Sequence, residues 1–224
     1  MGGPICQYAT VRGDTVIAII DYGAGNLTSV KLAFDTLKVK AEITSDLKKI
    51  LAAERVVFPG VGAAGSAMKN LTALKLADVI REVVSRGTPF LGICLGTQIV
   101  FEQSEEDGGT RGLGLIPGAV KLFRPTSRFD KVPQMGWNSV KQIRKSALFA
   151  DIEDNSEFYF VHSYYPAPAD SSFVLGETDY AGVRFASVVG KDNLVATQFH
   201  PEKSGRVGLR LLRNFVAWQP EKRK

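Results

Sequence analysis

Cysteine and histidine are scarce in this chain of 224 residues, which contains two of each. Two cysteines cannot build a disulfide framework, so a disulfide-stapled fold is excluded and a reducing compartment, the cytoplasm, is expected. So few thiols and imidazoles, without the spacing of zinc ligands, also predict that the protein has no metal site. The apolar runs fall well short of the roughly 18 residues that span a bilayer, so we expect no membrane partner.

Charge of one sign is only in modest excess. The chain has 28 Lys and Arg against 23 Asp and Glu, which gives a net charge of +5. Much of the excess lies between Lys121 and Lys145, where Asp130 is the opposing acid. This stretch matches no motif that reads nucleic acid, so we expect no nucleic-acid partner and favour a solvated or partner-facing surface.

The composition is that of a globular protein, with 45% hydrophobic residues. From residue 16 to about 103, short β-branched runs alternate with amphipathic segments, the pattern of βα units. After residue 109 strand-like segments follow one another directly, and a helix is expected over 206–217. We therefore predict an α/β fold with three layers, a mixed, mostly parallel sheet flanked by helices, of flavodoxin-like type. A single domain is expected over 15–220, after a flexible leader at 1–14.

The segment Gly92-Ile93-Cys94-Leu95-Gly96 lies between a buried strand and a helix expected over 97–103. It has the form of a nucleophile elbow, in which glycines flank a nucleophile on a strained turn, here with Cys in place of Ser. A helix N-terminus at this point favours the thiolate of Cys94. The backbone N–H of Leu95 is also placed to stabilise an oxyanion. The alternative is a small buried cysteine that only packs.

The general base must be one of two histidines. His200 precedes Pro201 and Glu202, and residues i and i+2 of an extended chain share a face, so Glu202 can orient the imidazole of His200. A surface histidine beside a salt-bridging glutamate is the alternative. His162 is expected to be structural. A second oxyanion donor is predicted in the loop 59–62, where Gly62 allows an adjustable peptide; an ordinary turn is equally compatible with this loop.

Two segments together resemble a known family. Gly-Ile-Cys-Leu-Gly-Thr-Gln at 92–98, with His-Pro-Glu at 200–202, is similar to the class I, or triad, glutamine amidotransferases. Within that family, segments 21–26, 134–138 and 160–164 look like the glutaminase subunit of imidazole glycerol phosphate synthase, an enzyme of histidine biosynthesis. The resemblance covers residues 16 to 217 and implies the class I amidotransferase fold.

The resemblance implies that Cys94, His200 and Glu202 hydrolyse glutamine to glutamate and ammonia without a cofactor. The ammonia would pass to a cyclase (β/α)₈ barrel, either a separate subunit or a fused domain. It also implies an oxyanion hole formed by the Val61–Gly62 peptide, which can lie flipped, and by Leu95. The residues that it assigns to glutamine are Gln98, Ser163 and Tyr164; Ser163 stands where many relatives carry Thr. The residues that it assigns to the cyclase interface are Asn26, Met135, Trp137, Tyr159 and Lys203.

Three alternatives to this function remain open at the level of sequence. The chain could serve a different synthase, such as pyridoxal phosphate synthase, although segment 134–138 argues against it. It could be a non-catalytic docking module of the same fold, which an intact triad opposes. It could also be a cysteine-dependent esterase. For Trp137, packing in the core is as compatible with the sequence as contact with a partner.

Overall fold

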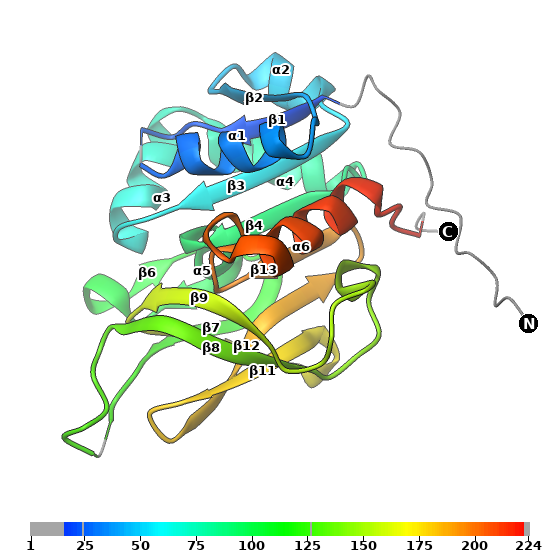
Figure 1. The fold of residues 1–224 in the computed structure, drawn as a ribbon. Coiled ribbons are helices and arrows are strands. Elements are labelled where there is room, and N and C mark those ends of the chain that lie inside the picture. Colours follow the sequence, from blue (N-terminus) through cyan, green and yellow to red (C-terminus); the bar gives the residue numbers. More distant parts are fainter. Residues whose placement is uncertain (1–15, 24, 126, 222–224) are drawn as a thin grey trace, which may run out of the picture.

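A computed structural model of the chain describes residues 16–23, 25–125 and 127–221 (Figure 1). The leader expected at 1–14 lies outside these residues. Within them, no helix has the length and apolar character needed to cross a membrane.

A nine-stranded mixed sheet runs through the centre of the molecule. Its strands are parallel from β2 to β13 and antiparallel from β13 to β9, which confirms the expected mixed α/β fold. In spatial order they are β2 (Ala41–Thr44), β1 (Ile17–Ile20), β3 (Arg55–Gly60), β4 (Phe90–Cys94), β13 (Leu194–Thr197), β12 (Val183–Lys191), β11 (Val174–Tyr180), β8 (Gln134–Gln142) and β9 (Ser156–His162).

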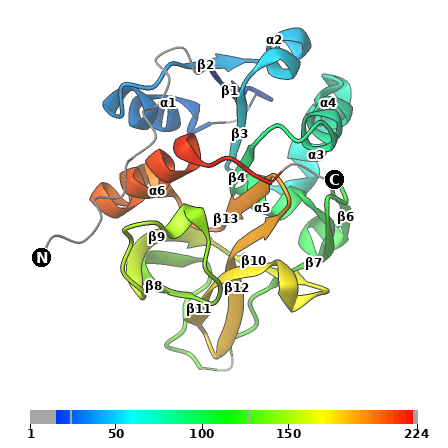
Figure 2. The ribbon, with the colours of Figure 1, turned by 90° about the vertical axis from the view of Figure 1, so that its right-hand side faces the viewer.

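Helices cover both faces of the parallel half of this sheet (Figures 1 and 2). One face carries α1 (Leu27–Thr36) and α6 (Gly205–Ala217), and the other carries α2 (Leu47–Ala52), α3 (Ala64–Ala73), α4 (Leu76–Ser85) and α5 (Leu95–Ile99). The alternation of side chains along each strand produces the two cores, because successive residues point to opposite faces. Ile17 and Ile19 pack into the core beneath α1 and α6, whereas Ala18 and Ile20 pack into the opposite core.

A second, four-stranded sheet packs beside the first, and the sequence did not reveal it. Its strands, in spatial order, are β10 (Tyr164–Pro168), β7 (Ile116–Leu122), β5 (Phe101–Ser104) and β6 (Thr110–Arg111). The helix expected over 97–103 is wrong in extent, because α5 ends at Ile99 and the chain enters β5 at Phe101. Short 3₁₀ turns complete the elements at Glu106–Gly108, Ala147–Phe149, Ser171–Phe173 and Pro201–Lys203.

The parallel arrangement brings three strand ends together. β4 lies between β3 and β13, with Gly60 opposite Cys94 and Thr197 opposite Ile93. In parallel sheets, ligands bind outside the carboxyl ends of the strands. The loops that follow β3, β4 and β13 therefore converge on one edge, which is where the candidate residues of the sequence lie.

Candidate active site

Cys94 stands at the sharp junction between β4 and α5. Its backbone is held at φ 52° and ψ −104°, a conformation that side-chain-bearing residues rarely adopt and that is concentrated at functional sites. The flanking glycines permit this turn. A Cβ at Gly96 would lie 2.0 Å from the carbonyl oxygen of Phe58, and one at Gly92 would lie 2.8 Å from the carbonyl oxygen of Gly96. The expected elbow is therefore present, with the thiol on its outer side.

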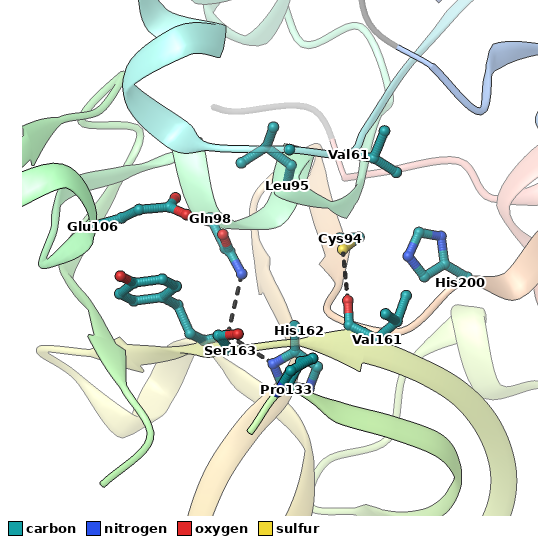
Figure 3. Close-up of a pocket in the computed structure, with 12 residues that line it drawn as sticks. Val61, Cys94, Leu95, Gln98, Glu106, Pro133, Val161, His162, Ser163 and His200 are labelled. Carbon is teal, nitrogen blue, oxygen red and sulfur yellow. Dashed lines mark hydrogen bonds between the residues drawn. The ribbon is translucent and has the colours of Figure 1, made fainter. Parts of the chain in front are cut away.

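The imidazole of His200 lies beside the thiol (Figure 3). Its other side is bound by the carboxylate of Glu202. The distance from His200 Nδ1 to Glu202 Oε1 is 2.7 Å, and both side chains are buried. The other ring nitrogen, Nε2, has no hydrogen-bond partner among the described residues, so it is free to exchange a proton with the sulfur or a substrate. Catalytic contacts are often long in the absence of substrate.

The electrostatics of the pair favour a charged imidazole. Burial alone lowers the pKa of His200, but its interactions with Cys94 and Glu202 outweigh burial and raise that pKa to about 10. The three sequence-predicted triad residues are thus brought together, although 106 positions separate Cys94 from His200.

A cavity of about 290 Å³ opens over the thiol. It is lined by every residue that the sequence assigned to catalysis, the oxyanion or glutamine, except Glu202, which stays behind the imidazole. These residues are Val61, Gly62, Cys94, Leu95, Gln98, Ser163, Tyr164 and His200. The volume suits a small amino-acid substrate rather than a large ligand.

Four residues that sequence reasoning did not assign to the site also line this cavity, and two of them, Glu106 and His162, are titratable. Glu106 belongs to an acidic run that looks solvated in the sequence, but it is partly buried and its Oε2 accepts a hydrogen bond of 2.7 Å from the backbone N–H of Ala64. Burial raises the pKa of Glu106. His162 is buried as expected of a structural residue, and burial lowers its pKa to about 4, so the ring is neutral. Only the fold, which brings residue 106 to α3, could have revealed Glu106.

Leu95 and Val61, which the sequence assigned to the oxyanion hole, both lie above the sulfur in the view of Figure 3. Leu95 is the first residue of α5, so its backbone N–H has no partner within the helix. Gly62 has φ +96°, and the space around it is open, because a Cβ there would meet nothing within 4 Å. A positive φ of this size is one that glycine adopts without strain.

The five residues assigned to a partner gather around the triad. Asn26 donates to Glu202, the carbonyl oxygen of Tyr159 accepts from the backbone N–H of His200, and Lys203 directly follows Glu202. Met135 and Trp137 lie on the neighbouring strand β8 with 67% and 55% of their surface exposed. This exposure excludes core packing for Trp137, whose ring contacts Tyr159 edge-on.

Comparison with known proteins identifies the family of the chain. The sequence model of the family described as "Glutamine amidotransferase class-I" matches residues 18–218, most of the chain. The chain belongs to the class-I glutamine amidotransferase family. The membership and the activity class inferred from the sequence are confirmed.

Curated relatives show which synthase subunit of this family the chain is similar to. The chain is 51% identical over 201 residues to the imidazole glycerol phosphate synthase subunit HisH of Methanocaldococcus jannaschii, covering 90% of this chain and 98% of that protein. It is 52% identical over 199 residues to the HisH subunit of Moorella thermoacetica, covering 89% and 93%. The sequence resemblance to this group is therefore confirmed.

Solved structures of the same fold are more distant in sequence. PurLQS from Thermotoga maritima matches with a TM-score of 0.69 at 16% identity, over 90% of this chain and 97% of that one. A glutamine amidotransferase from the same organism matches with a TM-score of 0.63 at 16% identity, over 90% and 82%. These likenesses establish the fold.

Proposed function

We propose that this chain is a glutaminase that supplies ammonia to a cyclase partner in the synthesis of imidazole glycerol phosphate, a step of histidine biosynthesis. The observation that carries the chemistry is a thiol on a strained elbow, facing an imidazole that a buried carboxylate orients. The likeness to HisH subunits at about half identity carries the choice of synthase. The unit that does this is the single domain expected over 15–220, acting in the cytoplasm.

Hydrolysis proceeds in two halves through a covalent intermediate. The sulfur of Cys94 attacks the side-chain amide carbon of glutamine and forms a tetrahedral oxyanion. The carbon–nitrogen bond then breaks, His200 gives its proton to the departing ammonia, and a thioester remains. Water attacks this thioester while His200 accepts the proton of the water, and glutamate leaves with the thiolate restored. Glu202 keeps Nδ1 protonated throughout, so Nε2 performs each transfer.

The oxyanion of both halves lies within reach of the N–H of Leu95 and of the rotatable Val61–Gly62 peptide. A donor pair of this kind contributes roughly a hundredfold to a thousandfold in rate per donor. Rotation of the Val61–Gly62 peptide when a partner docks would complete the pair. This gives the partner a means to control the rate without touching the triad.

Glutamine is held by the walls of the cavity through its amino-acid end. Gln98, Ser163 and Tyr164 supply side-chain and backbone polar groups along one wall. Glu106 supplies the negative charge that an α-ammonium group requires, and an ammonium there would offset the burial that raises the pKa of Glu106. A site built for an ammonium and an amide also disfavours simple esters.

The cyclase docks over the exposed face formed by Met135, Trp137 and Lys203. Lys203 follows Glu202, and Trp137 contacts Tyr159, whose carbonyl accepts from the backbone N–H of His200, so a barrel seated there would receive ammonia close to the site of release. The exposed large side chains of Met135 and Trp137 are of the kind that act as anchors at interfaces.

The deciding experiment measures ammonia release from glutamine with the chain alone and with a cyclase barrel carrying its nucleotide ligand. We expect release to rise by orders of magnitude in the complex, and Cys94→Ala to abolish it while the complex still forms. Ammonia transfer to a pyridoxal phosphate synthase instead, or hydrolysis of esters in preference to glutamine, would overturn the proposal. So would a failure of a glutamine-analogue electrophile to label Cys94 in the complex, because a docking module would give that result.

A further inference from the structure

The side-chain amide of Gln198 contacts the sulfur of Cys94. Gln198 lies just beyond β13, two residues before His200, and is fully buried. Its backbone N–H donates to the carbonyl oxygen of Ser187 at 2.9 Å, which fixes the residue at the end of the sheet. Its side-chain Nε2 lies 3.7 Å from Cys94 Sγ, and its Oε1 lies 3.2 Å from Gln98 Nε2.

The orientation of this amide follows from the donors and acceptors around it. The backbone carbonyl of Tyr164 can only accept, so the amide nitrogen of Gln98 must face it, at 3.1 Å. The same nitrogen has a second hydrogen, which Gln198 Oε1 accepts. Gln198 must therefore turn its own NH₂ group toward the sulfur, since a reversed amide would set two donors against each other. His162 Nδ1 also donates to the carbonyl of Tyr164, at 2.7 Å.

The sulfur thus lies between two groups that favour different protonation states of the thiol. The carbonyl oxygen of Val161, 3.8 Å from Sγ, can accept from a thiol but repels a thiolate. The amide of Gln198 can only donate, and a donor binds an anion more strongly than a neutral group. The side chain is buried, so no water competes for it.

We propose that Gln198 stabilises the thiolate of Cys94 and fixes its direction of attack, and that Gln98 holds Gln198 in this orientation. The inference rests on the proposed function only in taking Cys94 as the nucleophile. Gln98 lines the wall of the substrate cavity and also binds Gln198, so this contact connects the substrate wall with the sulfur.

The test measures the rate at which iodoacetamide alkylates Cys94 as a function of pH, in the full chain carrying Cys6→Ser. Gln198→Met keeps the length of the side chain and removes both hydrogen bonds. We expect alkylation near neutral pH to slow about tenfold, with the midpoint of the pH profile moved to higher pH. Gln198→Glu, which faces the sulfur with a carboxylate, moves the midpoint further. Gln103→Met and Gln103→Glu on the exposed side of β5 are the matched controls and leave it unchanged.

A substitution at Gln98 tests whether this residue orients Gln198. Gln98→Met removes the N–H donor that holds Gln198 Oε1, so the midpoint moves in the same direction by a smaller amount. Glutamine turnover separates the two residues, because Gln198→Met lowers kcat whereas Gln98→Met also raises KM. An unchanged alkylation midpoint in both Gln198 variants would overturn the inference, even if their turnover fell. If Cys94→Ala still hydrolysed glutamine, the proposed function would fail instead, since alkylation reports on the sulfur alone.

Discussion

The side-chain amide of Asn26 donates a hydrogen bond of 2.6 Å to Oε1 of Glu202, the same carboxylate oxygen that binds His200 Nδ1. Asn26 precedes α1 and lies 176 positions away from Glu202 in the sequence. The family resemblance assigns it to a partner, and here it also fixes the carboxylate that orients the general base. One residue therefore connects the proposed interface to the triad.

Replacing Asn26 tests this connection. Asn26 has φ 72°, which glycine adopts without strain, so Asn26→Gly removes the amide and spares the backbone. We expect kcat for glutamine to fall about tenfold in the complex, because Glu202 loses one of two hydrogen bonds that fix Oε1. Asn155→Gly is the matched control, since Asn155 is exposed and has φ 61°. Equal losses in the two variants would contradict the connection.

The members of the triad contribute unequally. His200→Ala removes the group that transfers every proton, and we expect kcat to fall on the order of 10⁵-fold. Glu202→Gln removes only orientation and charge, so the loss is smaller, on the order of 10³- to 10⁴-fold. Single-turnover measurement of ammonia release ranks the two. The ranking is wrong if the variants lose the same factor.

The alkaline limit of the reaction reports on His200. Its pKa is raised to about 10, so the imidazolium that protonates ammonia is present below that pH and is lost as pH rises through about 10. We expect kcat/KM to decline with a midpoint near pH 10. Glu202→Gln removes one of the interactions that raise this pKa, so its midpoint moves to lower pH. If the alkaline midpoint of Glu202→Gln stays near pH 10, Glu202 does not raise the pKa of His200.

Acid affects stability through His162. Its pKa is about 4 in the folded chain and about 6.5 when unfolded, so the unfolded chain binds more protons between these values. The free energy of unfolding therefore falls as pH drops from about 6.5 to about 4, by up to about 3 kcal/mol. Urea unfolding at pH 7 and pH 4.5 measures this. His162→Asn keeps a donor for the carbonyl of Tyr164 without titrating, so its stability varies less over the same range.

Trp137 tests the proposed interface. Its side chain is 55% exposed, so Trp137→Ala removes little core packing and leaves the melting temperature nearly unchanged. As a partner anchor it would weaken cyclase binding by at least tenfold, measured by calorimetry. Ile143→Ala, an exposed residue just beyond the other end of β8, is the control. Equal cyclase affinity in all three proteins would remove Trp137 from the interface.

Local sequence predicted the features that depend on neighbouring residues. The elbow at Cys94 follows from glycine spacing. The pairing of His200 with Glu202 was predicted from extended chain, but a 3₁₀ turn over Pro201–Lys203 is what brings the carboxylate back to the imidazole. These features require no knowledge of distant contacts.

Features that depend on pairing between distant segments could not be read from the sequence. A helix was expected over 97–103, but Phe101 pairs with Ile116 in the second sheet, and this pairing overrides the local pattern. Glu106 looks solvated until the fold brings it to the cavity. Gln198 looks like an ordinary strand residue, and only the register of β13 against β4 places its amide beside the sulfur.

The insertion of β13 between β4 and β12 has a consequence for synthesis on the ribosome. In chain order β13 follows every other strand of the described residues, so β4 has an unpaired edge until residues 194–197 emerge. An open edge is prone to pair with other chains. Until then the thiol has neither imidazole nor carboxylate beside it, so a nascent polypeptide carries Cys94 without its general base until residues 200–202 have been made.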